Sequence, residues 1–285
     1  MTKLDKDALP NGLLIEDQTL TLSKKYKQTD TITLKLSQRN QTKFNLVVEE
    51  SVEAKVIIEL IDNDTSDVTY NLNIDLKANS QVKFLILTEI QSKNASLKLT
   101  SMSQADSNLE FIGGFINDVM DARLNFDLVG KGAGAKVRTI TVSSKDHEQK
   151  LDIHMIHHAP YTAADMTNVG IAGQNGIIRL NGVGEINQGM VGSAAFQTLK
   201  GVITNDAAQI DVNPILIIDE HDVTAGHAAT VGKMEEEVLF YLRSRGITLE
   251  DAQRLIIHGY LQPIIDEIDD ELIKENVLRL VNERI

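Results

Sequence analysis

Short segments in which polar and apolar residues alternate, separated by turn-forming residues, restrict most strongly how this chain can fold. They extend from about residue 30 to residue 218. The alternation is most regular over residues 68–76 and recurs over 31–36, 96–99 and 123–128. A period of two is typical of strands with one buried face, and the Asn, Asp, Gly and Ser residues between the segments favour turns. The sequence therefore predicts a mainly β fold with many short strands.

Two β architectures fit this pattern. The alternating segments centred near Ile74, Leu99 and Phe126 lie about 25 residues apart, a spacing within the range of solenoid repeats. Sandwiches also contain many short strands. An aromatic content of 4% without Trp fits thin stacked coils, so the pattern favours a β-solenoid slightly over a sandwich.

The pattern becomes helical after about residue 230. Acidic residues at 235–237 suit a helix N-terminus, and residues 248–251 resemble a capping box that opens a second helix. Pro263 is expected to kink or end that helix, and Asp269 or Asp270 can cap a third.

We therefore divide the chain into three parts. These are an N-terminal lead segment (residues 1–29), a β core (30–230) and a small C-terminal helical domain (231–285).

Composition excludes several classes of function. The net charge of −13, from 41 acidic and 28 basic residues, argues against a nucleic-acid partner. No stretch approaches the roughly 20 apolar residues that span a bilayer, and the charged residues 1–10 precede no apolar leader, so we expect a cytoplasmic protein without a membrane partner. Cysteine is absent, which excludes disulfides, thiolate nucleophiles and cysteine-ligated metal sites built from this chain alone.

Histidines are densest around residue 154. His154, His157 and His158 lie near Asp152, with His147 upstream. On a strand His154 and His158 share one face whereas His157 points to the other, and no HExxH spacing is present. We expect structural or solvent-exposed roles for these histidines and no metal site.

Other catalytic patterns are equally unsupported. The glycine-rich residues 130–135 lack the order of a phosphate-binding loop and lie between two strand-like segments, so they are interpreted as a turn. No GxSxG elbow is present. Neither pattern supports a catalytic site.

One stretch is far more specific than these. Residues 214–232 read PILIIDEHDVTAGHAATVG, and residues 239–247 read LFYLRSRGI. The first closely resembles the PxLxIxxxDVxxxHGATVG signature of the SufB/SufD family, and the second matches that family's LFYLRSRGI nearly letter for letter. Upstream, residues 157–162 (HHAPYT) resemble the family's HxxPxT element. The resemblance is dense over roughly residues 110–260.

The resemblance implies a fold and a set of partners. The family fold is a right-handed parallel β-helix followed by a C-terminal helical domain. SufB and SufD paralogues pair through the β-helix, each carries the ABC-type ATPase SufC on its helical domain, and a transient iron–sulfur cluster forms near the pairing interface. These roles imply a scaffold subunit that is not an enzyme and binds no cofactor by itself. The resemblance also allows a homodimer of the isolated chain.

The same resemblance implies a candidate site. In the family, the SufB member supplies a cysteine and the SufD member supplies the histidine of HGATVG, which is His227 here. Because the chain has no cysteine, it resembles the SufD member. A neutral imidazole can replace a thiolate as an iron ligand, so His227 is the candidate cluster and metal ligand, and Tyr241, Arg243 and Arg245 are candidates for partner binding.

Two departures from the family pattern bear on this assignment. Ala228 replaces the family's glycine, which would disfavour a positive φ there. The family's usual N-terminal helical region is not evident, so we expect a short SufD-like form.

Two alternatives remain. One is a homodimeric β-helix adaptor of the same family without cluster contact. The other is a polysaccharide-acting β-helix enzyme, for which exposed aromatics and paired carboxylates would be needed.

Overall fold

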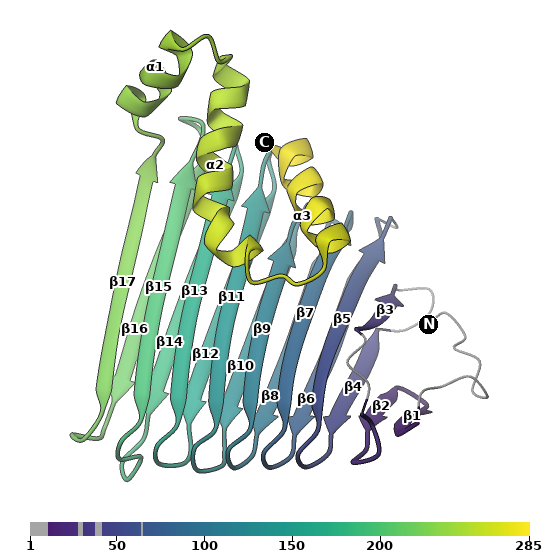
Figure 1. Ribbon diagram of the computed structural model, residues 1–285. Helices are drawn as coiled ribbons and strands as arrows, with labels where there is room; N and C mark the ends of the chain where they lie inside the picture. The colour runs from purple at the N-terminus through teal and green to yellow at the C-terminus, as the bar shows by residue number, and fades with distance from the viewer. Residues whose placement is uncertain (1–10, 28–30, 38–41, 64) are drawn as a thin grey trace.

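The computed structural model describes residues 11–27, 31–37, 42–63 and 65–285 of the chain. Within these residues the strands form two sheets that face each other (Figure 1). Sheet A contains β1 (Leu13–Glu16), β2 (Thr19–Leu22), β4 (Lys43–Val48), β6 (Val68–Leu76), β8 (Ala95–Ser103), β10 (Met120–Leu128), β12 (Glu148–His157), β14 (Ile177–Ile186) and β16 (Gln209–Ile218). Sheet B contains β3 (Ile32–Leu36), β5 (Glu53–Asp62), β7 (Gln81–Ile90), β9 (Asn108–Phe115), β11 (Gly134–Ser143), β13 (Ala163–Ala172), β15 (Ala194–Ile203) and β17 (Thr224–Lys233).

Successive strands alternate between the two sheets. Each strand from β4 onward pairs in parallel with the strand two positions earlier, whereas β1 and β2 form an antiparallel hairpin. Hydrogen-bonded partners in neighbouring coils lie 27 residues apart at Thr69 and Ser96, and 32 apart at Arg179 and Asp211. The predicted parallel β-solenoid is therefore confirmed.

The core lies between the sheets, because every second side chain of a strand points inward. Equivalent inward positions of neighbouring coils form columns in which like residues stack. In one column the rings of Phe84 and Phe111 lie 6.0 Å apart, and Phe111 contacts Phe126 of the opposite sheet at 5.2 Å between ring centroids. All three side chains are fully buried.

The turns between the strands also stack. In six successive turns on one side of the solenoid, from Ser51 to Gly192, a residue with a positive φ donates its N–H to a carbonyl of the next turn, as from Asn79 to Ala105 at 2.9 Å. The equivalent position in the glycine-rich segment is Gly132, with φ of +73°. Residues 130–133 thus form a solenoid turn.

Three helices follow the last strand: α1 (Glu236–Ser244), α2 (Leu249–Ile265) and α3 (Glu271–Arg284). The side chain of Thr248 caps α2 and that of Asp270 caps α3. α2 continues through Pro263 to Ile265, so the proline does not end the helix at once. β1 and β2 fall within the predicted lead segment, and β17 extends three residues beyond the predicted boundary at residue 230.

Helices α2 and α3 cover the outer face of sheet B (Figure 1). Ile140 and Val142 on that face pack with Ile257 and Leu261 of α2 and Val277 of α3 in one buried apolar cluster. Where α2 and α3 cover it, sheet B is therefore apolar on both faces.

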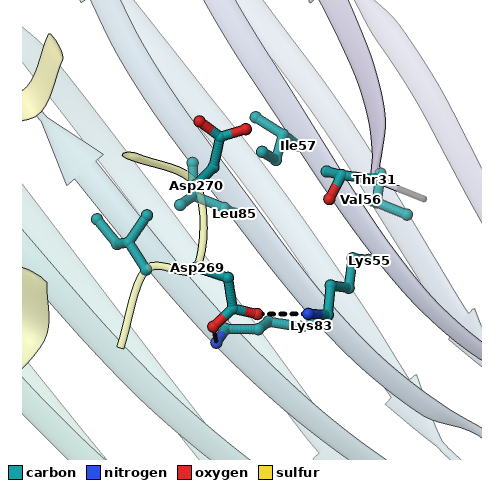
Figure 2. Close-up of a pocket in the computed structure, with 9 residues that line it drawn as sticks. Thr31, Lys55, Val56, Ile57, Lys83, Leu85, Asp269 and Asp270 are labelled. Carbon is teal, nitrogen blue, oxygen red and sulfur yellow. Dashed lines mark hydrogen bonds and ion pairs between the residues drawn. The ribbon is translucent and has the colours of Figure 1, made fainter. Parts of the chain in front are cut away.

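Ion pairs surround this apolar contact. In the turn between α2 and α3, Asp269 binds Lys55 of β5 at 2.6 Å and Lys83 of β7 at 2.9 Å (Figure 2). Near the C-terminus, Arg284 binds Asp118 at 2.6 Å. The helical turn is thereby tied to several coils at once.

Candidate functional site

The C-terminal end of the solenoid is the most exposed part of the β core. Within the described residues, β16 pairs only with β14, and β17 pairs only with β15, so each is an edge strand. Large apolar side chains are exposed here: Ile215 and Ile217 at 45% and Val231 at 43%. An open sheet edge with apolar side chains favours pairing with another chain.

His227 lies on β17 at this open end. It is in register with Gln197 of β15, which is in register with Met166 of β13. Because Met166 and Gln197 are buried inward-facing residues and parallel neighbours in register share a face, the imidazole also faces the interior. It is exposed because no further coil covers it among the described residues. A group bound at this end would meet an accessible imidazole.

The strand around His227 is unstrained. Ala228 is absent from the positive-φ residues of the chain and lies in the middle of β17. The alanine that replaces the family's glycine therefore fits the backbone.

The turn that leads into β17 is held by Glu220. Its carboxylate accepts backbone N–H groups of Gly189 at 2.9 Å, His221 at 2.7 Å and Asp222 at 3.3 Å. These hydrogen bonds, first that from Gly189, lower the pKa of Glu220. The terminal turn is in this way joined to the preceding turn.

The three predicted partner-binding residues lie on or next to α1, separate from His227. About 20 Å of β17 separates His227 from the end of the strand that leads to α1. No residue of α1 is buried, and Phe240 and Tyr241 are 76% and 56% exposed. The Arg245 guanidinium lies 5.2 Å from the Tyr241 ring centroid, and Arg243 lines a depression of about 490 Å³.

The backbone fixes this surface. Gly246 has φ of +86° and donates to the carbonyl of Arg243, while Ile247 donates to that of Leu242. This pair of bonds is a Schellman motif, which needs a residue tolerant of positive φ. The motif ends α1 and sets the angle between α1 and α2.

The structure separates the histidines around residue 154. His157 is buried, with Nδ1 at 2.6 Å from the Thr162 hydroxyl, and burial together with the nearby His158 lowers its pKa to about 4. His158 contacts Asp127 at 2.9 Å on the surface. His154 lies on the outer face of sheet A beside Asp152. Among the described residues, no three His, Asp or Glu side chains gather as a metal site.

The sequence reasoning did not identify Gln197. This residue is only 3% exposed in the interior beside His227. A signal was present, because Gln197 interrupts the alternating apolar positions Ala195 and Leu199.

None of the helices, over the part of the chain that is described, combines the length and apolar character needed to span a bilayer.

The fold and the open end define a class of protein: a two-sheet parallel β-solenoid with an uncapped terminal coil and an appended helical unit. The chain belongs to the family described as SUF system FeS cluster assembly, SufBD core domain, whose sequence profile matches residues 32–260. The predicted SufB/SufD resemblance is therefore confirmed.

Curated relatives support the SufD-like assignment. The chain is 30% identical over 231 residues to the iron-sulfur cluster assembly protein SufD of Bacillus subtilis, covering 81% of this chain and 50% of the relative. It is 25% identical over 248 residues to SufD of Escherichia coli, covering 85% and 58%. A SufBD family protein of Staphylococcus epidermidis is 28% identical over 167 residues, covering 58% and 36%. The chain thus spans about half the length of the SufD relatives it matches.

Proposed function

We propose that this chain is a non-catalytic, SufD-like scaffold subunit of an iron–sulfur cluster assembly complex. The observation that carries the proposal is the inward-facing His227 at the open end of the solenoid, in a chain without cysteine. The cluster is cargo of the complex, and this chain alone holds no cofactor. His227 supplies a neutral nitrogen ligand that complements thiolate ligands from a SufB paralogue.

Pairing with the paralogue uses the edge strands β16 and β17. Unpaired strand edges, with Ile215 and Ile217 exposed beside them, support the addition of strands from another solenoid. This arrangement would bring the open end of each partner, and with it His227, to the interface.

The ATPase SufC docks on α1 and the start of α2. Exposed Phe240 and Tyr241 beside Arg243 and Arg245 support this part of the proposal, because aromatic and arginine side chains are enriched at interface hot spots. The distance along β17 leaves the ATPase clear of His227.

The first test is co-purification with SufB and SufC, followed by anaerobic cluster reconstitution and absorbance spectroscopy. We expect a ternary complex whose cluster yield falls in His227→Ala and is unchanged in the control His154→Ala, which alters a histidine on the outer face of sheet A. A ternary complex in which both variants match the wild type would remove His227 from the assembly site.

The docking surface has its own test. Arg243→Ala and Arg245→Ala are each expected to weaken SufC binding about tenfold in calorimetry. Arg279→Ala on α3, whose guanidinium binds Glu283, is the control. Unchanged affinity in both α1 variants would exclude these arginines from the interface.

A second function is favoured by the same edge strands, because an edge can also pair with an identical chain. In that case the protein is a homodimeric adaptor without cluster contact. Isolation of a stable homodimer that binds neither SufB nor SufC would support the adaptor and contradict the cluster role.

A further inference from the structure

Gln197 is a polar residue in an apolar column of the solenoid core. The inward positions in register with it are Phe111, Val137 and Met166 on successive strands of sheet B, all fully buried. Gln197 comes next, and His227 is the last member of the column. The column therefore changes from apolar to polar only at its open end.

The orientation of the Gln197 amide is fixed. Its Nε2 donates to the carbonyl oxygen of Ile215 on β16 at 3.1 Å. Because only the NH2 end of the amide can donate to a carbonyl, Oε1 is identified as the opposite end. Oε1 is buried and has no hydrogen-bond partner in the described part of the chain.

The opposite sheet leaves space for this amide. Gly184 of β14 faces it, and a Cβ on Gly184 would lie 2.7 Å from Nε2 of Gln197. The glycine, which has no side chain, thus accommodates the amide across the interior.

A buried carbonyl oxygen without a partner destabilises a fold. Met166, at the preceding position of the column, is an apolar side chain of similar length that packs there without this cost. The unpartnered oxygen lies in register with His227, so the geometry indicates an imidazole N–H as the donor that it can accept.

We propose that Gln197 is a positioning residue for His227: its Oε1 accepts the N–H of one imidazole nitrogen and leaves the other nitrogen free to bind metal. In-register neighbours on parallel strands lie about 4.8 Å apart. Rotation of the His227 imidazole can therefore bring one of its nitrogens within hydrogen-bond distance of Oε1. Among the described residues, the imidazole of His227 makes no hydrogen bond that would compete with this one. Outer hydrogen bonds of this kind fix the tautomer of metal-binding histidines.

Metal binding by the second imidazole nitrogen rests on the proposed function, whereas the hydrogen bond between Gln197 and His227 does not. The hydrogen bond is tested in the isolated full chain by long-range ¹H–¹⁵N NMR of labelled histidine at about pH 8, where imidazole is neutral. The His227 signal is identified as the one that disappears from the spectrum of His227→Gln. We expect one tautomer to predominate, and Gln197→Met to change the tautomer ratio about fivefold, the factor expected for loss of one net hydrogen bond.

Two further variants separate positioning from packing. Gly184→Ala keeps the glutamine but displaces its amide, and is expected to change the tautomer ratio in the same direction. Thr141→Val is the control: the Thr141 hydroxyl is also buried without a partner in the described structure, but it lies on β11, away from His227. Thr141→Val should melt no lower than the wild type, and only Gln197→Met should alter the tautomer ratio of His227. An unchanged tautomer ratio in Gln197→Met and Gly184→Ala would overturn the inference.

Cluster assembly gives the second readout. In a complex with SufB and SufC, Gln197→Met is expected to retain about tenfold less cluster at limiting iron, the effect typical of losing an outer hydrogen bond to a metal ligand. If His227→Ala leaves the yield unchanged while Gln197→Met changes the tautomer, the hydrogen bond stands and the proposed cluster role fails. If His227→Ala lowers the yield and Gln197→Met changes neither tautomer nor yield, the cluster role stands and Gln197 has no positioning role.

Discussion

Glu220 connects the last two turns of the solenoid through a single carboxylate. Backbone N–H donors hold the ionised form, so the pKa of Glu220 is lower in the folded than in the unfolded chain. A lowered carboxyl pKa contributes stability that is present above the unfolded pKa of about 4.3 and is lost as pH falls through the folded value.

Glu220→Gln should therefore lower the denaturation midpoint at neutral pH, and the difference from the wild type should shrink below about pH 4. Urea unfolding across this range measures the effect. Glu275→Gln, at an exposed position on α3, is the control and should follow the wild type. A difference that is independent of pH would mean that the carboxylate charge has no part in holding the turn.

His157 is held neutral by burial, whereas Glu220 is held ionised, and both groups make the fold less stable on acidification. The pKa of His157 is lowered to about 4, mainly by burial and secondarily by the charge of His158. The unfolded chain binds a proton near pH 6.5 and the folded chain does not, so acidification favours unfolding between these values.

We expect the wild type to lose at most about 3 kcal/mol of stability through this group between pH 6.5 and 4. His157→Gln stays neutral and can retain a hydrogen bond to Thr162. The stability advantage of the wild type over this variant should be greatest above about pH 6.5 and should fall on acidification. Parallel pH profiles for the two proteins would contradict the assignment.

At the scale of elements, the attachment of α2 and α3 to sheet B depends on apolar packing more than on charge. The pairs of Asp269 with Lys55 and Lys83 are partly exposed, and such pairs contribute about 0.2–1 kcal/mol each. Leu261 is fully buried against the sheet, and truncation of such a leucine costs about 2–5 kcal/mol.

Asp269→Asn is accordingly expected to cost about 1 kcal/mol, and Leu261→Ala several times more, in chemical denaturation monitored by circular dichroism. The loss in Asp269→Asn should also diminish at high salt, because screening already weakens the pair. If Asp269→Asn lost more free energy of unfolding than Leu261→Ala, charge rather than apolar packing would dominate the attachment of the helices.

Strands of sheet A were easier to predict from the sequence than strands of sheet B, because helices cover only sheet B in the described part of the chain. Residues 68–76 alternate strictly and coincide with β6, because the outer face of sheet A is polar. In β5 and β7, five consecutive residues are buried, since α2 and α3 cover the outer face of sheet B. These strands lose the period of two, and the apolar runs at residues 56–58 and 84–87 indicate that one sheet is covered.

The candidate site was predictable only through resemblance. Alternation alone could not tell a solenoid from a sandwich, because both bury every second residue. The placement of His227 beside Gln197 depends on a register between strands about 30 residues apart in sequence. The motif identified His227, whereas the role inferred for Gln197 required the folded coils.

At the scale of the whole molecule, the two ends of the solenoid differ. At the N-terminal end the edge strands are short, with four residues in β1 and five in β3, and short edge strands resist pairing with another chain; Leu14 of β1 is exposed at 54%. At the C-terminal end, β16 and β17 lie open in the described structure. Association should therefore take place at the C-terminal end.

Ile217→Lys tests this asymmetry. Ile217 points outward from β16, in register with Glu185, so lysine is tolerated in the isolated fold but places a charge at the open edge, a feature that blocks edge-to-edge pairing. We expect sedimentation equilibrium to reveal at least tenfold weaker association, with SufB or between identical chains, and an unchanged circular dichroism spectrum. Leu14→Lys is the matched control at the hairpin end and should associate like the wild type. If Leu14→Lys dissociates the assembly and Ile217→Lys does not, the hairpin end is the pairing surface, and His227 lies at the far end of the solenoid from any partner.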